Sequence, residues 1–121
     1  MKETYQKFME ENPVKGYLKI RAYAASEAVP VEGVNVIVSH IIDNNRVIFF
    51  EGKTNESGVI DKIALPAPKL NPDNMEKPQN TKYDVEATFN NVKLLYIVNM
   101  YEDICVMQNI NIIPEIKVGD I

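Results

Sequence analysis

The chain has 121 residues, of which 45% are hydrophobic and 25% are charged, which is the composition of one ordinary globular domain. Its net charge of −4 at pH 7 argues against binding to nucleic acid, which needs a basic face, and against binding to an anionic membrane. The single cysteine, Cys105, excludes an internal disulfide and a cysteine-based zinc site.

Residues 1–13 are predicted to form a short helical arm. The helix spans Lys2–Asn12, with Thr4 as a candidate N-cap, and Pro13 ends it. Its apolar stripe consists of Tyr5, Phe8 and Met9. We expect the arm to pack onto the sheet or to close one end of it; docking onto a neighbouring chain is the alternative. The arm is charged and lacks the apolar core of a signal peptide, which favours a cytoplasmic or spore-associated location.

From Gly16 onward the pattern changes to strict alternation, which is typical of half-buried strands. Seven strands are predicted: Gly16–Ala25, Val34–Ile42, Arg46–Lys53, Val59–Leu65, Tyr83–Phe89, Val92–Met100 and Ile104–Ile113. Their regular spacing predicts an all-β domain over residues 14–118, in which two sheets form a sandwich.

The turns between these strands are rich in glycine and asparagine. In the stretch Thr54–Pro68, a turn around Gly58 precedes a short strand that Pro66 and Pro68 are expected to end, because proline donates no ladder hydrogen bond. Asp43-Asn44-Asn45 and Asn90-Asn91 are predicted hairpin turns. Residues 66–80 form a long proline-rich loop without apolar periodicity.

Five motifs in succession carry a family likeness. They are Gly16-Tyr17-Leu18-Lys19-Ile20, Pro30-Val31-Glu32-Gly33-Val34-Asn35-Val36, Thr54-Asn55-Glu56-Ser57-Gly58, Leu65-Pro66 and Tyr83-Asp84-Val85. Together they resemble a carboxypeptidase regulatory-like domain, and they are similar to modules in clostridial proteins associated with the spore and its cortex. The resemblance implies a seven-stranded, Greek-key, prealbumin-like (Ig-like) sandwich with an accessory role. The chain departs from the family pattern at Asn90-Asn91 and over Met100–Ile104.

No catalytic constellation is visible, and we predict a protein that is not an enzyme and has no cofactor and no metal. His40 and Cys105 are the only imidazole and thiol, and both are interpreted as structural strand residues. Hydroxyisourate hydrolases, which share the prealbumin-like fold, use several histidines, so that activity is not expected. Calcium binding at the Asp43 turn or around Asp73 is not favoured either, because the carboxylates are too few.

An isopeptide bond of the kind known in related surface-protein sandwiches would need a lysine, an asparagine and a carboxylate brought together. Lys19, Glu86 and Asn111 are the candidates, but each alternates with apolar neighbours and is expected to face solvent. We therefore interpret all three as surface residues.

Several strands are apolar on both faces, although a sandwich buries only one face of each sheet. This surplus predicts an interaction surface, for which the candidates are Phe50, Leu95, Tyr96, Tyr5 and Phe8. The expected function is that of an accessory module that binds a protein partner, or its own copy, through a sheet face or edge. The alternative is a module that binds peptidoglycan or another carbohydrate through tyrosines such as Tyr17, Tyr23, Tyr96 and Tyr101.

Overall fold

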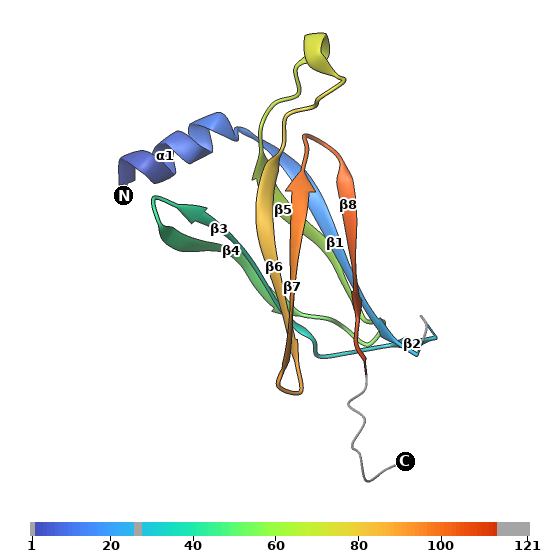
Figure 1. Ribbon diagram of the computed structural model, residues 1–121. Helices are drawn as coiled ribbons and strands as arrows, with labels where there is room; N and C mark the ends of the chain where they lie inside the picture. Colours follow the sequence, from blue (N-terminus) through green and yellow to red (C-terminus); the bar gives the residue numbers. More distant parts are fainter. Residues whose placement is uncertain (1, 26–27, 114–121) are drawn as a thin grey trace.

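The computed structural model describes residues 2–25 and 28–113, which form one short helix and two β-sheets (Figure 1). The elements in chain order are α1 (Lys2–Glu11), β1 (Val14–Ala24), β2 (Val29–Pro30), β3 (Asn35–Ile42), β4 (Asn45–Lys53), β5 (Val59–Ala67), the 3₁₀ turn η1 (Pro72–Asn74), β6 (Thr81–Phe89), β7 (Val92–Met100) and β8 (Cys105–Asn111). None of the described helices is long and apolar enough to cross a membrane.

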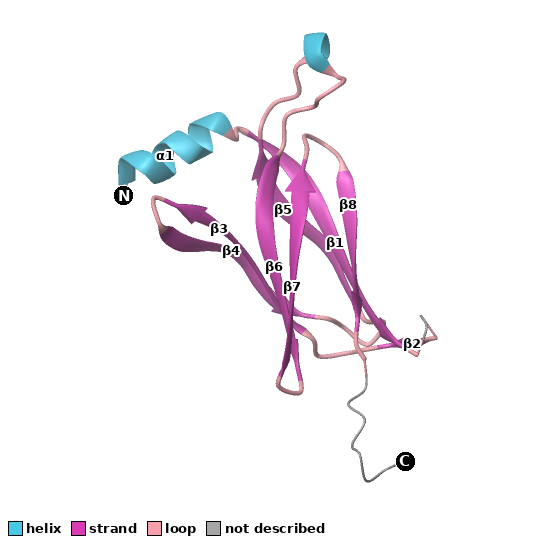
Figure 2. Cartoon of the chain, viewed as in Figure 1, coloured by secondary structure: helices cyan, strands magenta, loops and turns pink. Residues whose placement is uncertain are grey.

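Each sheet is assembled around long strands that pair over most of their length. In sheet A, β1 is central: it pairs antiparallel with β5 and with the short β2, and parallel with β8. In sheet B, the order β4-β3-β6-β7 is antiparallel throughout. The sheets lie face to face as two layers (Figure 2), so the predicted all-β sandwich is confirmed.

The strand count is eight within the described residues, one more than predicted. The additional strand is β2, in which Pro30 lies opposite Tyr23 and Val29 lies opposite Ala24. Alternation cannot reveal a strand of two residues, which forms here because the connection to β3 runs alongside β1. The predicted end of the β domain at residue 118 lies outside the described residues.

The inward faces of the strands carry the core, as the alternation predicts. On β1, Leu18, Ile20 and Ala22 are fully buried, whereas Tyr17 and Lys19 on the opposite face are partly exposed. The inward side chains of β3 and β6 are likewise buried, among them Val36, Val38, Tyr83, Val85 and Ala87. The period of two therefore assigns the faces of the long strands correctly.

Helix α1 covers the end of the β3–β4 hairpin, where the hairpin extends beyond sheet A (Figure 1). The ring of Phe8 lies 4.8 Å from that of His40 and 5.6 Å from that of Phe49, centroid to centroid, so the prediction that the arm packs onto the sheet is confirmed. Thr4 lies inside the helix, which spans Lys2–Glu11, so its prediction as the N-cap was wrong. After the helix, Asn12 binds the carbonyl of Phe8 and the hydroxyl of Thr81, which fixes the direction of the chain into β1.

The turn before β5 holds three segments together. The hydroxyl of buried Thr54 donates to the carbonyl of Val31 at 2.7 Å and accepts from the amide of Val34 at 3.0 Å. The carboxamide oxygen of Asn55 accepts from two amides of the turn. Gly58 has a φ of +74°, and a Cβ there would lie 2.4 Å from the carbonyl oxygen of Ala22. The prediction that glycine supplies a positive φ in this turn is confirmed, and its lack of a side chain also allows close packing.

The two hairpin turns of sheet B also form as predicted. Asp43 and Asn44, like Asn90 and Asn91, adopt positive φ angles, which is the conformation of tight two-residue hairpin turns. Asparagine and aspartate tolerate this conformation better than other side chains.

A buried hydrogen bond crosses between the sheets. The hydroxyl of Tyr83, on β6, donates to the carbonyl of Pro66, on β5, at 2.5 Å. Burial and then the neighbouring Tyr5 raise the pKa of the Tyr83 hydroxyl well above its usual value, so it remains a donor. The expectation that Pro66 ends the strand was wrong, because β5 continues to Ala67. Proline fits there because β5 is an edge strand. The carbonyl of Pro66 points away from β1, toward Tyr83, and the N–H of a strand residue points to the same side as its carbonyl. The N–H that proline lacks would therefore not have bonded to β1.

Two glycines with positive φ provide a matched test of the turn. Replacing Gly33 by alanine introduces only the strain of the left-handed conformation, about 1–2 kcal/mol, because nothing lies within 4 Å of its added Cβ. Replacing Gly58 adds an overlap with Ala22, for an expected total of about 3 kcal/mol or more. Guanidinium unfolding of both variants measures their free energies of unfolding. If the two variants lose the same stability relative to the wild type, the packing argument is contradicted.

The bond between the sheets provides a second test. Tyr83→Phe keeps the ring and its packing but leaves the Pro66 carbonyl without this donor, so we expect a loss of about 1–3 kcal/mol in the free energy of unfolding. Tyr101→Phe is the control, because Tyr101 is only half-buried and its hydroxyl makes no hydrogen bond within the described part of the chain. If the two variants lose the same stability, the bond does not stabilise the sandwich.

Candidate functional site

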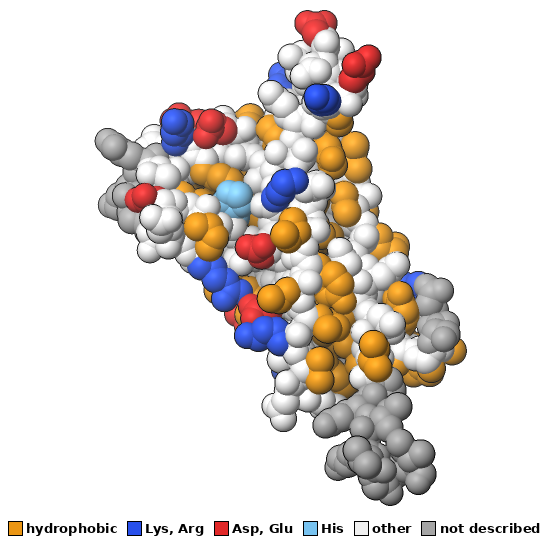
Figure 3. All heavy atoms as spheres, in the orientation of Figure 1, with side chains coloured by type: hydrophobic (Ala, Val, Ile, Leu, Met, Phe, Trp, Pro, Cys, Tyr) orange, Lys and Arg blue, Asp and Glu red, His pale blue; other side chains and the backbone are white. Residues whose placement is uncertain are grey.

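A band of exposed apolar side chains follows one side of the sandwich, along β7 and β8 (Figure 3). We call it the β7–β8 side, and it consists of Val92, Leu95, Ile97, Ile104 and Ile113. Leu95 and Ile97 are the most exposed of the three that lie on β7 itself, at 72% and 67%. Single exposed apolar residues are ordinary, but a contiguous band usually marks a contact surface.

The same side carries two strand edges. β7 ends sheet B, and β8 pairs only with β1 within the described residues. Neither strand contains proline, so each presents main-chain amide and carbonyl groups along its outer edge. Apolar side chains beside open edges offer a partner both burial and main-chain hydrogen bonds.

Tyr96 connects the two strands at this side. Burial raises the pKa of its hydroxyl, against the opposite effect of a main-chain hydrogen bond from Asn111 at the end of β8. Tyr96 itself is half-buried and packs against the core together with Leu94. Tyr96 thus reaches from β7 to the end of β8, at the boundary between the two sheets.

Next to the band, the outer face of sheet B is hollowed into a concavity of roughly 660 Å³. The hollow is lined by Ser39, Arg46, Asp84, Glu86, Leu95, Tyr96 and Ile97. One of its walls is therefore apolar and belongs to β7, whereas the other is charged and comes from β3, β4 and β6.

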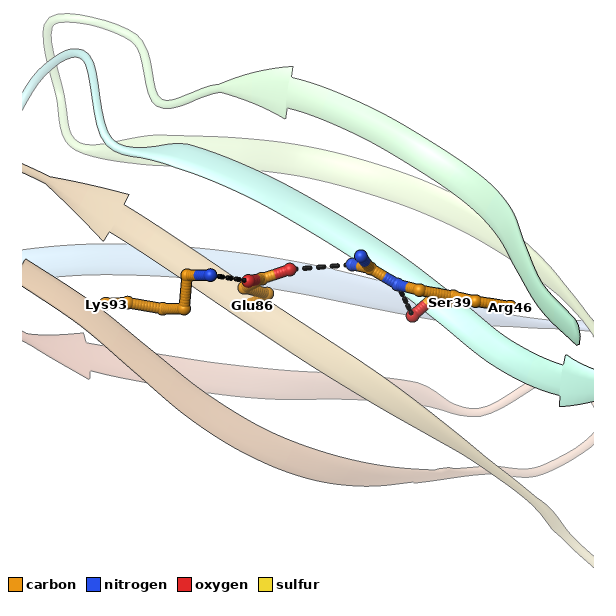
Figure 4. Close-up of polar contacts among 4 residues, drawn as sticks. All are labelled: Ser39, Arg46, Glu86 and Lys93. Carbon is orange, nitrogen blue, oxygen red and sulfur yellow. Dashed lines mark hydrogen bonds and ion pairs between the residues drawn. The ribbon is translucent and has the colours of Figure 1, made fainter. Parts of the chain in front are cut away.

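A network of ion pairs and a hydrogen bond runs through the charged wall and joins all four strands of sheet B (Figure 4). Glu86 on β6 accepts from Arg46 on β4 at 2.6 Å and from Lys93 on β7 at 2.7 Å. Arg46 also donates to the hydroxyl of Ser39 at 3.1 Å. The hydrogen bond from Lys93, and then that from Arg46, hold the pKa of the Glu86 carboxyl below its usual range. Within the network, the Glu86 carboxylate is shared between two cations, whereas Asp84, the other carboxylate of this wall, makes no ion pair with a described residue.

The five predicted interaction residues do not come together. Leu95 is exposed and Tyr96 lies beneath it, both at the β7–β8 side, but Tyr5 lies on α1, 43% exposed. Phe8 belongs to the core, at 9% exposure, and is not available as a contact surface. Phe50 also packs against the core, with its ring over Gly52, which has no side chain to obstruct it.

The position of Phe50 is a correction to the predicted alternation. A bulge between Val38 and Ser39 pairs Val38 with Phe50 but Ser39 with Ile48, so β4 has one additional residue there. Phe49 and Phe50 therefore both contact the core, although they are consecutive. Ile48 points outward instead, at 51% exposure.

The side chains considered for chemistry are also apart. His40 lies on sheet B, where its Nδ1 is 2.6 Å from the carbonyl oxygen of Lys82, and Cys105 is exposed at the start of β8 in sheet A. Cys105 is therefore a strand residue, as interpreted, but an exposed one at the strand's first position. Lys19 pairs with Asp61 on sheet A, on the opposite side of the sandwich from Glu86. Among the described residues, no three His, Cys, Asp or Glu side chains form a group suited to a metal ion.

Sequence reasoning missed Ile97 and the Arg46–Glu86–Lys93 network. Ile97 had a usable signal, because it follows Leu95 by two positions and must share its face. The network had none, because it depends on which strands are neighbours and in which register.

Comparisons with known proteins give little guidance. No family model matches the chain, and no curated protein does. A crystal structure of (S)-allantoin synthase is similar to 84% of this chain, with a TM-score of 0.47 and 11% sequence identity. The match covers 42% of that protein, so the chain spans less than half of its length. At this level of similarity the neighbour is not informative about the role of this chain.

The network makes a prediction about acid stability. A glutamate with a lowered pKa stabilises the folded state above its usual pKa, and this contribution is lost as the pH falls through the lowered value. Glu86→Gln should therefore cost up to about 1 kcal/mol at neutral pH, and this difference from the wild type should shrink as the pH falls below about 4.5 and vanish once the Glu86 carboxyl is protonated in the folded state. Urea unfolding across this range measures it.

The matched control is Glu51→Gln on β4, because Glu51 is exposed and makes no ion pair with another described residue. If the loss caused by Glu86→Gln is independent of pH, the ion pairs do not stabilise the fold.

Proposed function

We propose that this chain is a non-enzymatic interaction module of the carboxypeptidase regulatory-like type, with a prealbumin-like Greek-key sandwich. The strand order supports this assignment: the first and last long strands, β1 and β8, are parallel neighbours, and the other described pairs are antiparallel. The motif turn at Thr54 and Gly58 supports it as well, because its residues bind the segments on both sides of it.

The module binds a partner protein through the β7–β8 side. The observation that carries this proposal is the pairing of an exposed apolar band with two open strand edges on one side of the domain. A partner that covers Leu95 and Ile97 removes both side chains from water, and an extended segment can also continue a sheet. The other edge of sheet B, at β4, is less suited because its phenylalanines pack inward.

The proposal predicts the effect of charge on the band. Leu95→Asp combined with Ile97→Asp should weaken binding of the partner about tenfold or more, because two carboxylates would be desolvated on contact. Both side chains are exposed, so the free energy of unfolding should change little. Ile48→Asp is the control, since it places one carboxylate at another exposed apolar position of the same sheet, on β4, and Leu95→Asp alone is the single variant that matches its charge.

The measurement uses the purified domain in two steps. Proteins retained by the immobilised wild type but not by the Leu95/Ile97 variant are identified, purified and titrated against the wild type and both variants by calorimetry. The self-association of each variant is measured in parallel by sedimentation, which identifies a second copy as the partner. Equal affinities for the wild type and the Leu95/Ile97 variant would refute the proposed surface.

A further inference from the structure

The outer face of sheet A, on the opposite side of the sandwich from the ion-pair network, has a chemistry of its own. Alternate residues of the central strand β1 project from it, and they are either cationic or aromatic. With the neighbouring groups of β5 and β8 we call it the sheet A face: Lys15, Tyr17, Lys19, Arg21, Tyr23, Lys62, Asn109 and Asn111.

The sheet A face carries positive charge on an acidic protein. Four of its side chains are cations, of which three are lysines. Among the described residues, Asp61 is the one carboxylate that forms an ion pair with any of these lysines. That pair, between Lys19 Nζ and the Asp61 carboxylate, is long at 3.6 Å, and the Asp61 side chain is 85% exposed, so solvent screens it. The whole chain has a net charge of −4, so the cations of this face form a local positive region on a protein that is negative overall.

Two of the cations are held in place by aromatic rings. Lys62 Nζ lies 4.5 Å from the centroid of the Tyr17 ring, and the guanidinium carbon of Arg21 lies 5.1 Å from that of Tyr23. Cation–π contacts of this kind restrict otherwise mobile side chains. The charges are therefore partly ordered before any ligand arrives, which lowers the entropy cost of binding.

The neighbouring strand β8 adds neutral polar groups to the same face. Asn109 and Asn111 are exposed and lie in register with Arg21 and Tyr23. A carboxamide both donates and accepts hydrogen bonds, so it can bind the hydroxyl groups of a sugar. Alternate residues of a strand are about 6.6 Å apart, so the row from Lys15 to Tyr23 is about 26 Å long and suits an extended polymer.

We propose that the sheet A face binds a carboxylated polysaccharide, with the cations on its carboxylates and the asparagines on its hydroxyls. Nucleic acid fits less well, because bases stack on open aromatic faces, and here a cation lies over each tyrosine ring. This site is separate from the β7–β8 side, so the domain could hold a partner protein and a polysaccharide at once.

The test is affinity electrophoresis and calorimetry of the whole chain with polygalacturonate, and with uncharged dextran as the neutral polymer. We expect binding to polygalacturonate alone, weakening as salt rises from about 50 to about 200 mM. Lys15→Glu with Lys62→Glu should lower the affinity about tenfold or more, because repulsion replaces two attractions. The matched control is Lys53→Glu with Lys69→Glu, which changes the net charge equally at exposed positions outside the sheet A face.

Three results would overturn the proposal. They are a failure of the wild type to bind polygalacturonate, an equal loss of affinity in both double variants, and tighter binding to single-stranded DNA or polyglutamate than to polygalacturonate. Leu95→Asp with Ile97→Asp should leave polysaccharide binding unchanged, and a loss there would place the site at the β7–β8 side instead.

Discussion

The hydrogen bond from Tyr83 to the Pro66 carbonyl links the two layers of this sandwich within their buried interior. Its ring lies 5.4 Å from that of Phe49 and 5.5 Å from that of His40, and Phe8 packs against both of these, so α1 joins the same aromatic cluster. Dispersion and burial keep the sheets together without specifying their relative position, whereas a buried directional bond does specify it. The position of the helical arm thus depends on the contact that aligns the sheets.

The exposed side of the sandwich lies where the last strands of the two sheets meet. Sheet B ends at β7, and β8 pairs only with β1 among the described strands of sheet A. The inward residues Leu94 and Tyr96 of β7 remain half-buried at this boundary. Leu95 and Ile97 project from the outer face of sheet B, which no described element covers there, so their exposure follows from the two-layer architecture.

Local patterns in the sequence predicted much of the fold, because period-two alternation and positive-φ turns are properties of short segments. The faces of β1, β3 and β6, the asparagine hairpin turns and the role of Gly58 all followed from them. The errors concern information that is not local. Whether Pro66 ends a strand depends on β5 being at an edge, and the facing of Phe50 depends on a bulge that register with β3 imposes. For the same reason Phe8 was expected at a surface that the β3–β4 hairpin covers.

The two faces of the sandwich differ in how their charges are balanced. On sheet B, Glu86 lies between Arg46 and Lys93, and the network is satisfied within the protein. A partner at the neighbouring β7–β8 side therefore gains mainly from burial of apolar surface, with little dependence on salt. On sheet A, the lysines of β1 and β5 outnumber their carboxylate partners, and aromatic rings hold two cations in place. A ligand there would gain mainly from charge, with strong dependence on salt, so ionic strength distinguishes the two proposed binding modes.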